Sequence, residues 1–364
     1  MATKKPLARF WKALDEIPEA TTDRQEWSVR LGDDWAVAAT YLTAMGRLAK
    51  EVACPSPGGD GCPRKVVKHA DGRLRAVCGN KPAECDPVDL TRDEVTCLAL
   101  DRSKLAATVR AMFKAEESDL PPGDGVAMLV GSHGVAAGLA IPIVLVIPGP
   151  MTMVSAETLS AFGREAGPVA VVAPTAQSIP QEVRAALASR GHLVLSLSEI
   201  ITVNDHRVVG TRPADEMLAT LREKLLTARV PMTSGRAWLL PADARWDELT
   251  FEFTAADVIN VRFRNETKRF EPEHFQMKDR RTGKPTEQWA LLKIFAAHGG
   301  KLGWTDSGAK VMVKKRKQEL GKKLRASFGL QAEPIVWKRG AKVYQTAFSI
   351  RGDVLDDGRR GTRG

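Results

Sequence analysis

Apolar residues in the first 53 positions recur at the three-to-four-residue spacing of amphipathic helices. Two predicted faces are formed by Phe10, Trp11, Leu14 and Ile17 and by Trp35, Ala38, Leu42, Met45 and Ala49. We therefore predict a helical N-terminal segment. A stretch rich in Gly and Pro, residues 55–63, then interrupts the periodicity.

From about residue 126 to residue 226, short apolar runs alternate with amphipathic stretches. The run 143–147 is continuous and rich in β-branched residues, and further runs follow at 169–173 and 192–197. Continuous runs of this kind are typical of buried parallel strands. Helices are predicted over 156–165, 180–190 and 214–226. The alternation predicts a small parallel sheet covered by helices, hence an α/β domain.

The C-terminal part begins with two strands of alternating apolar residues, Leu249/Phe251/Phe253 and Ile259/Val261/Phe263. A helix is predicted over 286–298 and a long basic helix over 307–328. The strands of a hairpin, 335–337 and 342–348, flank a turn at 338–341. On the long helix, an apolar stripe lies opposite a basic face. The apolar stripe consists of Val313, Leu320, Leu324 and Phe328. The basic face consists of Lys314, Lys315, Lys322 and Arg325.

Helix, basic helix and basic hairpin, in this order, are typical of a winged helix. The long helix of such a module enters the major groove of DNA, and the hairpin contacts the backbone or the minor groove. A solvated surface helix with an ordinary hairpin is the alternative. The predicted DNA-binding residues are Lys314, Lys315, Lys322, Arg325, Lys338, Arg339 and Lys342.

These roughly 100 residues resemble the OmpR/PhoB-type winged-helix effector domain of bacterial transcription regulators. Those domains also begin with short strands, and their recognition helix has a basic segment ending in Leu-x-x-x-Leu, which is Lys314–Leu324 here. Their wing ends in an aromatic strand, comparable with Val343–Phe348. The turn Arg339–Lys342 departs from the Gly-x-Gly-Tyr turn of that family. The resemblance implies double-stranded DNA as the partner.

The charge distribution points to the same end of the chain. The net charge is +10 overall, and residues 301–364 hold 16 Lys and Arg against 6 Asp and Glu. The first 300 residues are therefore neutral, and the whole positive excess lies in the last 64. A local excess of this kind suits a polyanion, because neutralised phosphates release counterions. A basic tail that keeps the protein soluble is the alternative.

Four of the five cysteines, Cys54, Cys62, Cys78 and Cys85, flank a predicted hairpin. Asp71–Gly72 is a strong turn signal, and folding there brings these residues toward the base of the hairpin. Four converging thiolates predict a structural, zinc-ribbon-like Zn²⁺ site. The spacings of seven and six residues are wider than the usual knuckles. Disulfides and four free thiols are the alternatives, and Cys97 is predicted to lie in the core.

The predicted α/β domain has no recognisable catalytic motif. The chain has neither a G-x-x-x-x-G-K-[ST] loop nor a G-x-G-x-x-G loop. The predicted strand ends, Pro148–Pro150 and Pro174–Thr175, offer no Asp for phosphotransfer. We therefore do not expect an enzyme, and we assign the domain a sensing or partner-docking role for a small-molecule or protein effector.

We predict an α/β multidomain protein whose parts follow one another along the chain. They are a helical and zinc-ribbon-like region over 1–125, an α/β domain over 126–226, a linker over 227–248, a winged helix over 249–350 and a disordered tail over 351–364. The function predicted is that of a DNA-binding transcription regulator. The alternatives are a subunit of a nucleic-acid-processing complex, such as a phage-defence system, and a protein–protein adaptor. Whether the protein forms a homodimer is left open.

No secretory signal follows the basic start of the chain, because an apolar segment is missing there. The longest apolar stretch, 135–147, is shorter than the roughly 20 residues that span a bilayer and contains Pro142. We therefore expect no membrane partner and a cytoplasmic, nucleoid-associated protein.

Overall fold

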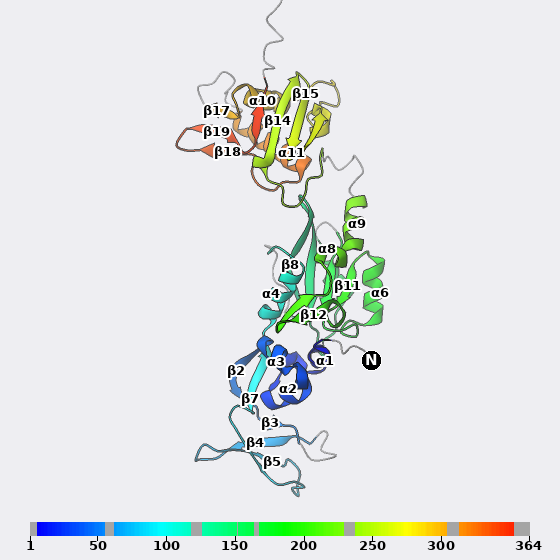
Figure 1. The fold of residues 1–364 in the computed structure, drawn as a ribbon, viewed down its shortest axis with the longest axis vertical. Helices are drawn as coiled ribbons and strands as arrows, with labels where there is room; N and C mark the ends of the chain where they lie inside the picture. The colour runs from blue at the N-terminus through cyan, green and yellow to red at the C-terminus, as the bar shows by residue number, and fades with distance from the viewer. Residues whose placement is uncertain are drawn as a thin grey trace, which may run out of the picture. The chain divides into compact units, whose positions relative to one another are not determined.

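The computed structural model describes residues 6–54, 62–117, 126–150, 152–163, 167–228, 237–303 and 313–352. The chain has a mixed α/β fold with several small sheets (Figure 1). It separates into two compact units. The first contains Met1–His133 and Ile141–Leu225, and the second contains Gly134–Ala140 and Leu226–Gly364.

The first unit begins with three helices beside a three-stranded sheet. The helices are α1 (Ala8–Glu16), α2 (Arg24–Leu31) and α3 (Trp35–Ala38). The sheet has the order β1-β7-β2, with β1 (Thr21–Asp23), β7 (Thr96–Leu100) and β2 (Leu42–Leu48) all antiparallel. Phe10, Trp11 and Trp27 are fully buried, so this part has a core of large aromatic residues.

The predicted helix through residues 42–49 is wrong, because this segment forms β2. Leu42, Thr43 and Ala44 pair with β7, and Gly46 has a φ of +70°. Met45, assigned to a buried helical face, is 46% exposed. The pairing with β7 satisfies the backbone of this segment and overrides its weak helical periodicity.

A second sheet of the first unit surrounds the predicted hairpin. Its strands are β3 (Glu51–Val52), β4 (Arg64–Lys68), β5 (Leu74–Val77) and β6 (Val88–Leu90), in the order β3-β4-β5-β6. All three pairings are antiparallel. The turn lies at Asp71–Gly72 as predicted, where Gly72 has a φ of +88° that favours glycine.

The core of this sheet is very small. It consists of four buried residues, Val52, Leu74, Ala76 and Val95, with Leu48, Ala49, Val66 and Leu90 packed against them. Val67 and Val88 point outward and are 39% and 42% exposed. A four-stranded module with so few buried side chains gains little from hydrophobic burial.

The third sheet has the order β11-β10-β9-β8 and lies in the first unit, except for the ends of β8 and β9 within residues 134–140, which belong to the second. Its strands are β8 (Ala127–Ala136), β9 (Leu139–Val146), β10 (Ala170–Ala173) and β11 (Leu193–Ser196). The last three are parallel, as predicted. β8 is joined to its neighbour β9 by the turn Ala137–Gly138 and therefore runs antiparallel to it.

Two helices of this α/β part are shorter than predicted, α5 (Ala156–Ser160) and α6 (Gln181–Ser189), and the predicted helix 214–226 is divided into α8 (Ala214–Met217) and α9 (Ala219–Ala228). The helices α4 (Arg102–Met112) and α7 (Leu197–Ile200) were not predicted. Leu218 separates α8 from α9 within the predicted helix 214–226. A two-stranded sheet, β12 (Ile201–Asn204) and β13 (Arg207–Gly210), precedes α8.

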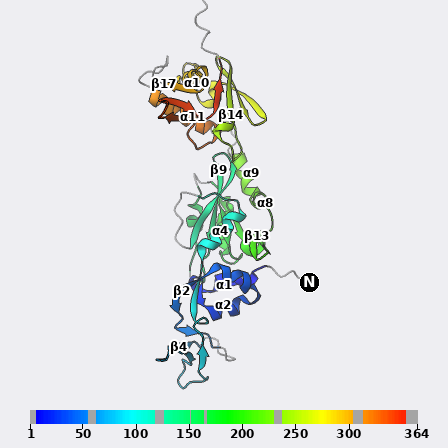
Figure 2. The same cartoon turned by 60° about the vertical axis from the view of Figure 1, so that its left-hand side comes forward.

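The second unit combines two sheets with two long helices. One sheet has the order β16-β15-β14-β20, with β14 (Leu249–Ala255), β15 (Val258–Phe263), β16 (Glu266–Phe270) and β20 (Ser349–Arg351). The helices α10 (Glu287–Ala297) and α11 (Val313–Phe328) pack together (Figure 2). The other sheet has the order β17-β19-β18, with β17 (Lys301–Gly303), β19 (Val343–Thr346) and β18 (Ile335–Lys338).

Aromatic rings in tilted and edge-to-face contacts fill the core between the sheet and these helices. Phe251 of β14 lies 4.4 Å from Phe348 and 5.6 Å from Phe328 of α11, measured between ring centroids. Trp289 of α10 lies 5.3 Å from Phe253. The alternating apolar residues of β14 and β15 therefore face this core, as predicted.

The segment before β14 differs from the predicted linker. Trp238, Leu240 and Trp246 are only 5%, 1% and 3% exposed and belong to the core of the second unit. The indole nitrogen of Trp246 donates to the carbonyl oxygen of Ala332 at 2.7 Å. Residues 237–248 thus form part of the folded second unit, whereas residues 229–236 lie outside the described residues.

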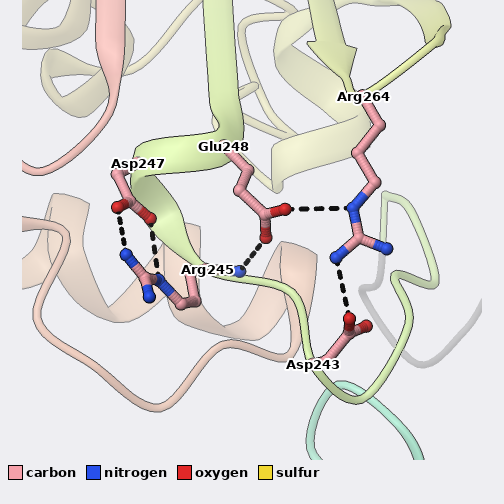
Figure 3. A network of polar contacts seen from close by, with 5 residues as sticks. All are labelled: Asp243, Arg245, Asp247, Glu248 and Arg264. Atoms are coloured by element: carbon pink, nitrogen blue, oxygen red, sulfur yellow. Dashed lines mark hydrogen bonds and ion pairs between the residues drawn. The ribbon is translucent and has the colours of Figure 1, made fainter.

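A polar network fastens this segment to the turn between β15 and β16 (Figure 3). Arg264 donates to Asp243 at 2.9 Å and to Glu248 at 3.0 Å, and Glu248 also accepts the backbone N–H of Arg245 at 3.0 Å. Arg245 in turn pairs with Asp247. The cation of Arg264 is therefore already engaged by two carboxylates.

Candidate nucleic-acid interface and thiol cluster

Helix α11 has the buried and exposed sides that the sequence predicts. Leu320, Leu324 and Phe328 are fully buried, whereas the side chain of Val313 lies outside the described residues. Lys314, Lys315 and Lys322 on the opposite side are exposed. Residues 307–312 of the predicted helix also lie outside the described residues.

The other cations of α11 have protein partners. Arg325, a predicted DNA-binding residue, pairs with Glu333, and Arg316 donates to Glu287 at 2.8 Å. Lys323 donates to the carbonyl oxygen of Gln276 at 2.6 Å, and burial lowers the pKa of its ammonium group. Within the described residues no carboxylate pairs with Lys314, Lys315 or Lys322, so their charge is directed to solvent.

The hairpin formed by β18 and β19 presents the remaining predicted cations. Lys338, Arg339 and Lys342 are all exposed around its turn. Lys342 has a φ of +53° and donates its backbone N–H to Arg339 at 3.3 Å. The hairpin tip is thus basic, as the sequence predicts.

An aromatic pair beside this hairpin was not predicted. Trp337 and Tyr344 lie directly opposite each other on β18 and β19, with ring centroids 4.9 Å apart. Trp337 is 38% exposed, and the ammonium nitrogen of Lys317 lies 5.8 Å from the Tyr344 ring. The sequence contains a signal for this pair. The two aromatic residues are equally far from the hairpin turn, so they lie opposite each other on the two strands.

The antiparallel topology of β3–β6 brings the four predicted cysteine ligands to one edge of the sheet. Cys54 follows β3 and Cys62 precedes β4, whereas Cys78 follows β5 and Cys85 precedes β6. Because neighbouring strands alternate in direction, all four positions lie at the same end. We call these four residues the thiol cluster.

The sulfur atoms of the thiol cluster are neighbours. Cys54 Sγ lies 3.9 Å from Cys85 Sγ, too far for a disulfide bond of about 2.05 Å. Cys62 interacts with Cys78 and Cys54, and Cys85 also interacts with Cys78. The cluster is not a finished coordination shell: in the part of the chain that the structure describes, no three His, Cys, Asp or Glu side chains are arranged to hold an ion.

Arg64, the first residue of β4, is buried beside these thiols with only 3% of its surface exposed. Its Nε donates to Cys54 Sγ at 3.4 Å, and another guanidinium nitrogen donates to the carbonyl oxygen of Asp86 at 3.0 Å. Sequence reasoning missed this residue. Its signal was a cation two positions after Cys62, at the start of a strand.

The thiols differ in acidity. Backbone N–H groups of Glu84 and Asn80 donate to the sulfur of Cys78 and lower its pKa to about 7. Burial raises the pKa of Cys85 to about 11, and hydrogen bonds to Cys78 and Cys54 add to this increase. Cys78 therefore forms a thiolate more readily than Cys85 does.

Near the carboxyl end of β10 lies a carboxylate that belongs to the N-terminal helix α1. Asp15 of α1 accepts hydrogen bonds from the hydroxyl groups of Thr175 and Ser178, both at 2.5 Å. The strand ends themselves offer no Asp, as the sequence indicated. This contact ties the N-terminal helix to the edge of the α/β sheet where ligands bind in many open α/β folds.

Replacing Asp15 by Ala is expected to lower the free energy of unfolding of the first unit by about 1 kcal/mol, because two hydroxyl donors lose their acceptor. Asp15→Asn keeps one acceptor oxygen and should lose less. Hydrogen exchange of the amides of α1 and β10, resolved by mass spectrometry, measures both effects within the first unit of the full chain. Unchanged stability of Asp15→Ala would show that water satisfies Thr175 and Ser178 equally well.

Comparison with known protein families, with curated proteins and with solved structures finds no match for this chain. Among the described helices, none combines the length and the apolar character needed to cross a bilayer.

Proposed function

We propose that the chain binds double-stranded DNA through the exposed side of α11 and the turn of the β18–β19 hairpin, and that it acts as a transcription regulator. The observation that carries the proposal is the set of three exposed lysines on α11, opposite a fully buried stripe. A rigid helix that presents several cations in one direction suits the phosphate backbone and the groove edges of DNA.

The arrangement of charges favours a ligand over a merely solvated face. Two carboxylates near α11 pair with arginines, Glu287 with Arg316 and Glu333 with Arg325. Among the described residues, no carboxylate pairs with Lys314, Lys315 or Lys322, which can therefore meet an external anion. The exposed Lys338, Arg339 and Lys342 on the hairpin supply a second group of cations for the same polyanion.

Replacing Lys315 and Lys322 together by Ala should weaken binding to duplexes of any sequence. Each neutralised phosphate contributes about 0.9 to the log–log slope of affinity against salt, so the slope should flatten by about two units. The measurement is fluorescence anisotropy with a mixed-sequence duplex over a range of salt concentrations. Folding should be unaffected, because both side chains are exposed.

The matched control is Lys65→Ala with Lys68→Ala, which removes the same charge from exposed positions of β4. This variant should keep the wild-type slope. If the α11 variant stays folded and also keeps that slope, α11 does not contact phosphate, and a protein–protein adaptor becomes the better explanation of the second unit.

A further inference from the structure

One sulfur–sulfur distance within the thiol cluster matches that of a mononuclear metal site. With sulfur–zinc bonds near 2.3 Å, the sulfur atoms of a tetrahedral site are about 3.8 Å apart. Cys54 Sγ and Cys85 Sγ are 3.9 Å apart. Hydrogen bonds also link Cys85 with Cys78 and Cys78 with Cys62, and Cys62 interacts electrostatically with Cys54.

The surroundings of the thiol cluster supply hydrogen-bond donors to its sulfur atoms. Backbone N–H groups of Glu84 and Asn80 donate to Cys78, and the buried guanidinium of Arg64 donates to Cys54. A guanidinium is always charged. Four thiolates around a dication carry a net negative charge, which the cation of Arg64 would partly offset.

We propose that the thiol cluster binds one Zn²⁺ ion as four thiolates, and that the buried Arg64 supports the site by hydrogen bonding to a ligand sulfur. Zinc suits four thiolates in a tetrahedron, and a closed four-ligand shell is structural, because it leaves no position for a substrate. Iron can also be bound by thiolates, and the metal content of the purified protein distinguishes iron from zinc.

A bound metal would also stabilise a part of the fold that has a small core. Among the described residues, the core beside the β3–β6 sheet has four buried apolar side chains, and small modules with cores of this size commonly depend on a bound metal. Binding would draw the sulfurs into a complete shell and couple metal affinity to the folding of these strands. The proposal is independent of DNA binding, which involves the second unit.

The first test measures metal in the purified full-length chain by elemental analysis. Wild type should hold about one Zn²⁺ per chain, as a single four-thiolate site requires. Cys78→Ser should lose the metal, whereas Cys97→Ser should retain it, because Cys97 lies in β7, away from the cluster. Iron or no metal in wild type would overturn the proposal.

Cobalt keeps the test independent of how well the serine variant folds. Co²⁺ added to metal-stripped wild type should give the intense visible bands of a tetrahedral site and a sulfur-to-cobalt charge-transfer band, and Zn²⁺ should abolish both. Absence of the charge-transfer band, with all four thiols open to alkylation in the presence of Zn²⁺, would show that the cysteines do not bind metal.

The role of Arg64 has its own variant. Arg64→Gln removes the cation and should weaken Zn²⁺ affinity, measured by competition with a chromogenic chelator, by roughly ten- to a hundredfold. The control, Arg75→Gln, removes an arginine of β5 that pairs with Asp89 at 2.7 Å and should leave the affinity unchanged. Equal Zn²⁺ affinities of the two variants would show that Arg64 does not support the metal site.

Discussion

Phe328→Ala is expected to destabilise the second unit by about 3–5 kcal/mol, the usual cost of removing a buried phenyl ring. Phe328 is fully buried at the end of α11. Its ring centroid lies 5.9 Å from Trp246, 5.6 Å from Phe251 and 5.7 Å from Phe275, so the ring joins the segment before β14, the sheet and the turn before α10. Truncation leaves a cavity that these elements cannot fill without moving.

The effect is best followed by hydrogen exchange resolved by mass spectrometry, because the chain has two units and a single melting temperature would mix them. Amides of α11 should lose protection in Phe328→Ala, and amides of β10 should not. Trp337→Ala, which removes a larger but partly exposed aromatic ring, is the control and should cost about 1 kcal/mol or less. Wild-type protection of α11 in Phe328→Ala would mean that the apolar stripe does not hold this helix.

This stripe shows what could be predicted from the sequence. The pattern of Leu320, Leu324 and Phe328 is sufficient to orient α11, because a 3.6-residue period and a strong apolar contrast leave one solution. The alternating residues of β14 and β15 and the Asp71–Gly72 turn were predictable for the same reason: each is a short-range signal that no tertiary contact opposes.

Other features depended on tertiary contacts that the sequence does not display. Leu42 and Met45 fit a helical face, yet the segment pairs with β7, more than 50 residues later. Trp238 and Trp246 stand in a Pro-containing stretch typical of a linker, but they pack into the core of the second unit.

Polar partners were equally invisible in the sequence. Asp15 contacts Thr175 and Ser178 over a separation of about 160 residues. Arg325 was predicted to face DNA, and it pairs with Glu333 of the same unit. Spacing identifies which side of a helix is polar, but only the folded chain determines which of its charges already have partners.

If the thiol cluster binds Zn²⁺ as proposed, removing the ion is expected to unfold the β3–β6 sheet while the second unit stays folded. Structural zinc sites contribute about 10–16 kcal/mol of apparent binding free energy at neutral pH. The four buried apolar residues described beside this sheet contribute too little burial energy to replace that contribution. The strands are held at one end by the cysteines and at the other by the single turn at Asp71–Gly72. We therefore expect the whole sheet to lose its structure as one cooperative element.

Hydrogen exchange before and after treatment with a strong chelator provides the measurement. Amides of β4 and β5 should lose protection, those of α11 and β14 should keep it, and added Zn²⁺ should restore the original pattern. Cys78→Ser should resemble the chelated protein without any chelator, and Cys97→Ser should resemble the untreated one. If β4 and β5 keep their protection after the metal has been shown to leave, the small core of Val52, Leu74, Ala76 and Val95 is sufficient by itself, and the bound ion does not stabilise the fold.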